Sequence, residues 1–362
     1  MSRWEVSVAT TTQQAAVTRN RHVDASQVIA WIIGVLLVIL VVVGSYRTLM
    51  LGRYTPAQWR DFITFGIAQG SIYALIALGY TMVYGVLQMI NFAHGEVFTG
   101  GAFASYFFVN ALAQSGFLKA HPFLTLIAGI LVAAVTSMTI AVLVERIAYR
   151  PLRFAPRLVP LITAVGASFF LQYTYRGFFG SGVKAFPTFP VLRGTLFGIQ
   201  RTLIVAFVGA LLTLLILLIF LRYTRTGLAI RAVAEDLEAA ALMGVNVDRT
   251  IASTFAVGGA MAGVASVLYA LLFPQVQFFM GFLPGIKAFT SAVLGGIGNL
   301  PGAALGGLVL GIVESVGPSL ILDGLGIPAA HQLKDAIAFS ILVLILIFRP
   351  TGLLGERVAS RV

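Results

Sequence analysis

Long uninterrupted apolar blocks divide this chain, and they limit its fold more than any other feature of the sequence. Clear examples are residues 28–44, 203–221 and 336–348. A block of about 17–25 apolar residues matches the hydrocarbon core of a bilayer, where only helices and closed barrels satisfy all backbone polar groups. Barrel strands would instead show short segments of alternating polarity, which are not visible here. We therefore expect an all-α, polytopic membrane protein.

The composition excludes several other classes of protein. Only 10% of the 362 residues are charged and 59% are hydrophobic, whereas a soluble domain carries about 25% charged residues. The chain has no cysteine and four scattered histidines, which argues against disulfides and metal sites. Its net charge of +11 is not gathered into a basic, aromatic-interleaved surface of the kind that binds nucleic acid. We expect no metal, no cofactor and no nucleic-acid partner.

About nine or ten membrane segments can be traced along the chain. One of them, at 284–297, is short and interrupted by glycines, so we expect a half-helix or a re-entrant piece there. The chain then divides into a polar tail over 1–27, a transmembrane domain over 28–349 and a C-terminal tail over 350–362. The segments lie near residues 28–44, 62–87, 93–113, 121–144, 158–178, 201–221, 251–272, 284–297, 302–319 and 333–349.

Arginine and lysine are distributed unevenly between the loops, and this predicts the orientation. If both termini are cytoplasmic, the loops 145–157 and 222–250 and the tail 349–362 hold eleven basic residues. The loops that then face outward hold three, as the positive-inside rule requires. Three arginines between residues 47 and 60 fit poorly; either the first span is misread or this stretch includes an interfacial helix.

Small residues recur four positions apart, which predicts close helix packing. In lipid, this spacing lets two helix backbones approach each other where apolar side chains alone give no drive to associate. The pairs are Gly66 and Gly70, Gly302 and Gly306, and Gly307 and Gly311.

The longest polar insertion, residues 222–250, predicts a helix on the cytoplasmic side. Residues 229–243 have high helix propensity, their apolar members recur at spacings of three and four, and Gly244 is a natural helix stop. Helices that bind lipid surfaces carry mostly basic residues on the polar face, whereas this loop has four arginines and four acids. The balance favours docking onto a partner protein. The candidate residues are Arg231, Glu235, Asp236, Glu238, Ala239, Ala240 and Gly244.

This stretch resembles the coupling helix of ABC importer permeases. Their EAA motif has Glu-Ala-Ala and, after three further residues, a glycine, which Glu238-Ala239-Ala240 and Gly244 match. The later Ile and Leu-Pro elements of the motif are absent, so the match is partial. Residues 70–103, 225–246 and 291–315 resemble the signature stretches of high-affinity branched-chain amino-acid permeases. This more specific resemblance covers about residues 58–355 and leaves the first span outside.

The resemblance implies a multi-pass subunit of the bacterial inner membrane with the larger, type II-like importer fold. Such a permease pairs with a second, related permease, and two cytoplasmic ATP-binding subunits drive the pair. A periplasmic binding protein delivers leucine, isoleucine or valine as the small-molecule substrate. The residues agree with this division of labour, because the chain has no GxxxxGK[ST] phosphate loop and is not expected to be an enzyme.

A polar cluster interrupts the apolar pattern at residues 91–96. Ionisable residues inside a membrane are costly and face the protein interior or a watery path, and a broken helix exposes backbone groups able to bind a zwitterion. Asn91, His94 and Glu96 are therefore candidates for the translocation path. In the alternative, Asn91 and His94 cap helices at the interface and Glu96 is a first-turn acid. Glu314 is a further candidate, although a hydrogen bond across helices is the simpler role for it.

Two alternative functions stay open. A secondary carrier driven by protons or sodium would need an intramembrane chain of acids and histidines, and only His94, Glu96 and Glu314 are available. It would also leave the charge-balanced loop helix unexplained. A nearer alternative is a permease of the same family for urea, short amides or other amino acids, because the binding protein largely selects the cargo.

Overall fold

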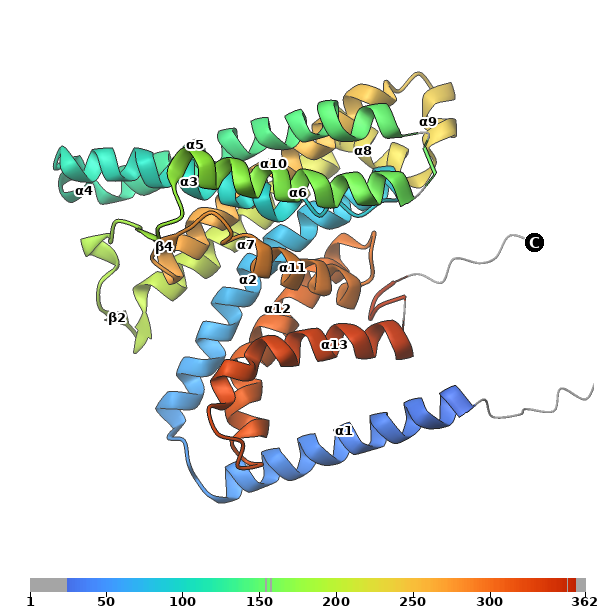
Figure 1. Ribbon diagram of the computed structural model, residues 1–362. Helices are drawn as coiled ribbons and strands as arrows, with labels where there is room; N and C mark the ends of the chain where they lie inside the picture. Colours follow the sequence, from blue (N-terminus) through green and yellow to red (C-terminus); the bar gives the residue numbers. More distant parts are fainter. Residues whose placement is uncertain (1–24, 154, 157, 350, 356–362) are drawn as a thin grey trace, which may run out of the picture.

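The computed structural model describes residues 25–153, 155–156, 158–349 and 351–355. Most of the two tails expected from the sequence lies outside these residues. Helices occupy all ten expected membrane segments, and α1 diverges from the remaining bundle (Figure 1). These helices are α1 (Ala25–Met50), α2 (Pro56–Leu87), α3 (His94–Gln114), α5 (Pro122–Val144), α6 (Leu158–Phe179), α7 (Arg201–Tyr223), α10 (Val247–Leu272), α11 (Phe282–Gly295), α12 (Leu300–Gly317) and α13 (Lys334–Phe348).

The helices confirm the all-α, polytopic fold. Among the described residues, seven helices are long and apolar enough to cross a membrane, namely α1, α2, α5, α6, α7, α10 and α12. The 14 residues of α11 rise about 21 Å at 1.5 Å per residue, which is less than the ~30 Å hydrocarbon core. The segment at 284–297 is therefore too short for a full span, as expected from its sequence.

Helix α2 forms the centre of the bundle. In its most apolar stretch 72% of the residues are buried, against 11% in α1. The helix starts with a capping box, in which the Gln58 amide donates to the Thr55 hydroxyl and the Thr55 amide donates to the Gln58 side chain. Pro56 occupies the first turn, where its missing N–H costs nothing. Residues 56–62 thus begin the span itself and do not form a separate interfacial helix.

A seam of glycines joins α2 to α12. A Cβ atom at Gly70 would lie 2.8 Å from the Gly307 carbonyl oxygen and 2.9 Å from the Leu308 Cα atom. A Cβ atom at Gly66 would lie 2.8 Å from the Ile312 Cα atom. The backbones therefore touch with no room for side chains, which confirms the packing role expected for these glycines.

Helix α1 is fastened to the bundle near its C-terminal end. The Thr48 hydroxyl donates to the Ser319 carbonyl at 3.4 Å, and the Arg53 guanidinium donates to the Asp323 carbonyl at 2.7 Å. The Tyr54 hydroxyl also donates to the Asp323 carboxylate. From this attachment the helix runs away from α2 and alongside the C-terminal part of the chain (Figure 1).

Short elements mark the two ends of the bundle. At one end, which we call the β2 end, β1 (Lys184–Ala185) pairs with β4 (Gln275–Val276) and β2 (Thr195–Leu196) with β3 (Ile199–Gln200), both antiparallel. At the other, the α9 end, lie α8 (Arg225–Glu235) and α9 (Leu237–Leu242) (Figure 1). Helix α7 connects the two ends, so loops 180–200 and 224–246 lie on opposite sides of the membrane.

Two helices begin inside the bundle instead of at its ends. The ring of His94, the first residue of α3, lies against Gly79 of α2, and a Cβ atom at Gly258, near the middle of α10, would lie 3.8 Å from it. The Gly281 residue that precedes α11 in turn contacts Gly95. The first turns of α3 and α11 therefore meet in the interior, which is the broken-helix arrangement found at solute sites of transporters.

Candidate functional site

The structure brings Asn91, His94 and Glu96 together in the interior, each only 1% exposed. The Tyr149 hydroxyl donates to the Asn91 Oδ1 atom at 2.7 Å. The His94 ring meets the Tyr80 ring edge-on, with centroids 4.9 Å apart. Helix α3 begins after Ala93 without any side-chain cap. The Asn91 and His94 side chains therefore do not cap a helix, and this part of the alternative is wrong. Its other part is confirmed, because Glu96 is an acid in the first turn of α3.

Two buried polar atoms of this cluster, one on the His94 ring and one on the Glu96 carboxylate, lack a hydrogen-bond partner among the described residues. On Glu96 this atom is Oε2. The Glu96 backbone carbonyl is satisfied, since it accepts from the Tyr175 hydroxyl of α6 at 3.0 Å. A buried carboxylate oxygen without a partner is costly and calls for a functional explanation.

A cavity lies beside Glu96, between the first turns of α3 and α11 and the middle of α6. Its volume is about 200 Å³, which is smaller than the ~300–1,000 Å³ of pockets for drug-sized ligands. Apart from Glu96 its walls are mainly apolar and aromatic. They include Tyr80, Phe92, Val165, Phe169, Phe282 and Ile286.

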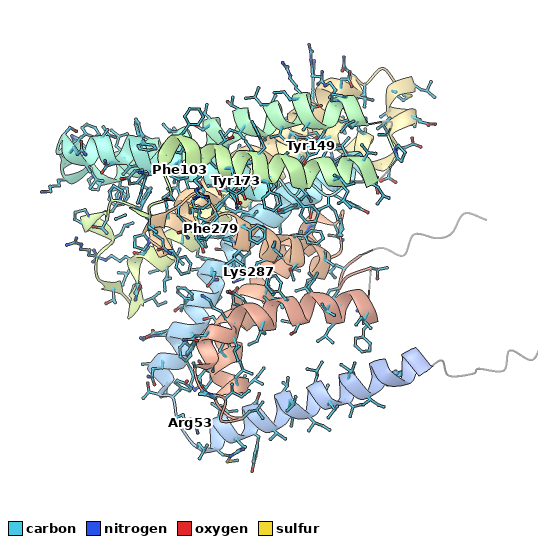
Figure 2. The ribbon with its side chains drawn as sticks, in the orientation of Figure 1. Arg53, Phe103, Tyr149, Tyr173, Phe279 and Lys287 are labelled. Carbon is cyan, nitrogen blue, oxygen red and sulfur yellow. The ribbon has the colours of Figure 1, made fainter. Side chains whose placement is uncertain are left out.

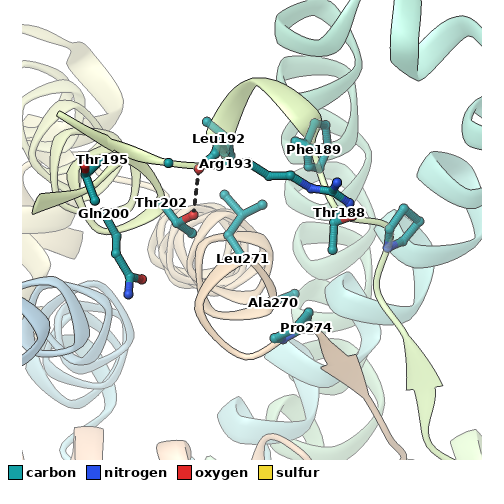
Figure 3. A pocket seen from close by; sticks show the side chains of 12 residues that line it. Thr188, Phe189, Leu192, Arg193, Thr195, Gln200, Thr202, Ala270, Leu271 and Pro274 are labelled. Carbon is teal, nitrogen blue, oxygen red and sulfur yellow. Dashed lines mark hydrogen bonds between the residues drawn. The ribbon is translucent and has the colours of Figure 1, made fainter.

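A larger hollow of about 440 Å³ lies at the β2 end, between loop 187–202 and the end of α10 (Figure 3). Two hydrogen bonds join polar groups at its rim. The Arg193 guanidinium donates to the Thr188 hydroxyl at 3.2 Å, and the Thr202 hydroxyl donates to the Leu192 carbonyl at 3.5 Å. Among the described residues, no buried polar atom without a partner lines this hollow, in contrast to the Glu96 cavity.

Glu314 lies apart from this cluster, in a second buried charge group. The Lys287 Nζ atom is 2.5 Å from the Glu314 Oε1 atom and 2.6 Å from the Asp335 Oδ1 atom. Lys287 lies where α11, α12 and α13 come together (Figure 2). The cross-helix hydrogen bond expected for Glu314 is confirmed, but its partner is a lysine. Neither Lys287 nor Asp335 was predicted from the sequence as a partner of Glu314.

The polar loop 222–250 forms two helices, not the single helix expected over 229–243. Helix α8 ends at Glu235, and Asp236 has an extended backbone. The Asp236 carboxylate then accepts from the Ala239 amide at 2.9 Å and caps the start of α9. The break occurs because aspartate at this position satisfies an orphan N–H of the next helix. Gly244 follows with a φ of +84°, so the expected left-handed stop is confirmed.

The break also changes which residues of the loop face outward. Ile230, Val233 and Ala240 are buried, whereas Leu242 is 89% exposed and Met243 is 84% exposed. The prediction of one continuous apolar stripe over residues 229–243 is therefore wrong. The apolar residues of α8 pack on the bundle, whereas those at the end of α9 are exposed. The remaining candidates Arg231, Glu235, Asp236, Glu238 and Ala239 are exposed at this end.

An ionic cluster that was not predicted from the sequence supports this loop. Glu145, fully buried at the end of α5, accepts from Arg150 at 3.2 Å and from Arg153. Arg153 also bonds to Asp248 in the first turn of α10. It thereby ties the end of α5 to the helix that follows Gly244. From the sequence, Arg150 and Arg153 counted only toward the basic charge of the loop 145–157.

The comparisons with known proteins decide the family. A family model described as "Branched-chain amino acid transport system / permease component" matches residues 62–346. The high-affinity branched-chain amino acid transport system permease protein BraD of Pseudomonas aeruginosa is 44% identical over 306 residues, 82% of this chain and 96% of BraD. The chain belongs to this permease family.

Other comparisons agree. The permease is 42% identical to the corresponding LivH protein of Escherichia coli strain K12 over 304 residues, 82% of this chain and 96% of LivH. It is 28% identical to a probable LivH permease of Methanocaldococcus jannaschii over 293 residues, 80% of this chain and 90% of that protein. No solved structure matches it. The permease is thus a multi-pass inner-membrane transport subunit and not an enzyme, and α1 precedes the matched residues.

Proposed function

We propose that this permease is a transmembrane subunit of an ATP-driven importer for leucine, isoleucine and valine. The observation that carries this proposal is the identity of 44% and 42% to two permeases named for branched-chain amino acids, over 96% of their lengths. Its partners are a second, related permease, two cytoplasmic ATP-binding subunits and a periplasmic binding protein. Permeases of this family for urea, amides or other amino acids are the alternative that an uptake test separates.

The α9 end faces the cytoplasm in this proposal and docks onto the ATP-binding subunits. Two features of the loop support such a contact. The exposed Leu242 and Met243 side chains form an apolar tip, which suits insertion into a groove of a partner protein. Buried Ala240 packs the tip on the bundle. The Arg153–Glu145 and Arg153–Asp248 ion pairs join the end of α5 to α10, the helix that follows the tip, so a displacement of the tip is transmitted to both helices.

The cargo is tested by uptake in cells that lack their own branched-chain amino-acid importers. Cells that express this permease with a second permease, two ATP-binding subunits and a binding protein are expected to accumulate labelled leucine. Unlabelled isoleucine and valine should compete, whereas urea and acetamide should not. Accumulation of urea or acetamide without any leucine uptake would overturn the proposed cargo and leave the family unchanged.

The docking role is tested by placing a charge on the exposed tip. In Leu242→Asp the carboxylate would have to be desolvated against an apolar groove, which is unfavourable. We expect co-purification of the ATP-binding subunits to fall at least tenfold. Phe197→Asp is the matched control, because Phe197 is 90% exposed at the opposite end of α7. Equal recovery of ATP-binding subunits with both variants would show that α9 is not the docking element.

Gly244→Val gives a second test of the same loop. No atom lies within 4 Å of a Cβ atom built at Gly244, so the substitution is strained only by its positive φ. The tip should therefore be displaced while the bundle still folds, and leucine-stimulated ATP hydrolysis should fall severalfold. Ala240→Trp does not give this separation, because Ala240 is buried within the permease itself.

A further inference from the structure

We propose that the cavity beside Glu96 is a binding site for a zwitterionic amino acid, in which the Glu96 carboxylate accepts hydrogen bonds from the α-ammonium group. This inference rests on the proposed function, because it assigns a place in the permease where the imported solute is held. It adds the chemistry by which the permease itself, and not only the binding protein, distinguishes its cargo.

Within the described part of the chain, the Glu96 carboxylate lacks a hydrogen-bond donor at the cavity. One of its oxygens is paired with nothing among the described residues, although the side chain lines the cavity. Two nearby hydroxyl groups are engaged elsewhere, and the Tyr80 and Ser168 hydroxyls, which also line the cavity, do not bond to this oxygen. The Tyr175 hydroxyl donates to the Glu96 backbone carbonyl, and the Thr99 hydroxyl donates to the Gly95 carbonyl at 3.2 Å. An ammonium group, with three donors and a positive charge, supplies what this carboxylate lacks.

The charges around the cavity suit a ligand with no net charge. The N-terminal turns of α3 and α11 both border it, through Gly95 and Glu96 on one side and Phe282 and Gly285 on the other. Each helix N-terminus acts as roughly half a positive charge, so together they balance the Glu96 carboxylate. A zwitterion adds no net charge to this arrangement. A simple amine or a simple carboxylate would leave it charged within the membrane, which is costly.

The cavity has a polar side formed by two helix starts and an apolar side formed by side chains. Glycines at 95, 281 and 285 bring the two helix starts into backbone contact; a Cβ atom at Gly285 would lie 3.1 Å from the Gly95 Cα atom. The opposite walls are apolar, with Val165 and Phe169 on α6 and Ile286 on α11. The polar end of an amino acid then faces the helix starts and Glu96, and its branched hydrocarbon side chain faces α6.

The experiment uses the full importer reconstituted in proteoliposomes, with initial uptake measured over a range of substrate concentrations. Wild-type importer is expected to take up leucine and to exclude 4-methylpentanoate, which has the leucine side chain and carboxylate but no ammonium group. In Glu96→Gln the amide keeps the size of the side chain but loses its charge. Leucine uptake should fall at least tenfold at low concentration, and the preference for leucine over 4-methylpentanoate should shrink.

Two further variants make the result specific. Asp61→Asn removes an exposed carboxylate at the start of α2 and should leave uptake unchanged. Phe169→Trp enlarges a wall residue from α6 and should reduce leucine uptake more than alanine uptake, whether or not Glu96→Gln assembles with its partners. Uptake by Glu96→Gln equal to wild type, or an equal effect of Phe169→Trp on leucine and alanine, would overturn the site. A wild-type importer that takes up no leucine would instead overturn the proposed cargo.

Discussion

Replacing Lys287 with methionine is expected to abolish most of the folded permease. Lys287 is buried and pairs with Glu314, whose side chain is 1% exposed. Removing the lysine leaves that carboxylate buried without a counter-charge, at a cost of ~3–5 kcal/mol. This is a large part of the ~5–15 kcal/mol by which folded proteins are stabilised. The yield of monodisperse protein in detergent and its melting temperature measure the effect.

The matched controls separate loss of the pair from loss of a positive charge. Lys119→Met removes an exposed lysine in the short helix α4 (Phe117–Ala120) and should melt like the wild type. In Lys287→Met with Glu314→Met no unpaired buried charge is left on α11 or α12, so much of the folded yield should return. Asp335 on α13 has a side chain 36% exposed, but its Oδ1 atom, which faces Lys287, is buried, so we expect this recovery to be incomplete. A fully stable Lys287→Met variant would contradict the importance of this pair.

Gly70→Leu is expected to separate α2 from α12. The nearest atoms to a Cβ at Gly70 are backbone atoms of Gly307 and Leu308, which cannot move aside as a side chain can. Overpacking of a tight core costs ~1–3 kcal/mol and occasionally more, and here it acts on the most extensive helix contact of the bundle. We expect aggregation on size-exclusion chromatography or a melting temperature lowered by several degrees.

Gly166→Leu is the control for this prediction. Gly166 lies on α6 and is exposed, and no atom is within 4 Å of a Cβ atom built there. The same glycine-to-leucine change should therefore leave the elution profile and melting temperature close to those of the wild type. Equal behaviour of the two variants would mean that the α2–α12 contact can open without loss of the fold.

The membrane segments could be predicted because each is an apolar block whose ends are marked locally. The capping box of Thr55 and Gln58 and the Asn246 cap of α10, which accepts from the Arg249 amide at 2.9 Å, are such local signals. Asp236 was also a local signal, since aspartate is preferred at N-caps. It was missed because the surrounding alanines have high helix propensity and hide the break.

Partners that are distant in sequence could not be predicted in the same way. Helical periodicity shows which face of a helix is buried but not which helix covers it. Tyr149 is 58 positions from Asn91, and Lys287 is 27 positions from Glu314. The lysine itself was a usable signal, because a cation within an apolar segment requires a nearby acid. No sequence pattern indicated that one oxygen of Glu96 would be unpaired, because this depends on how three helices pack around it.

The contact between α2 and α12 also bears on how the chain enters the membrane. Helix α12 begins more than 200 residues after α2 ends. At a synthesis rate of about 5–20 residues per second, α2 waits on the order of 10–40 s for this partner. During that time its glycine face and the polar Gln69 and Ser71, buried in the finished bundle, lack the neighbours that will cover them. Translation that stops before residue 300 would leave the central helix inserted but unable to complete its packing.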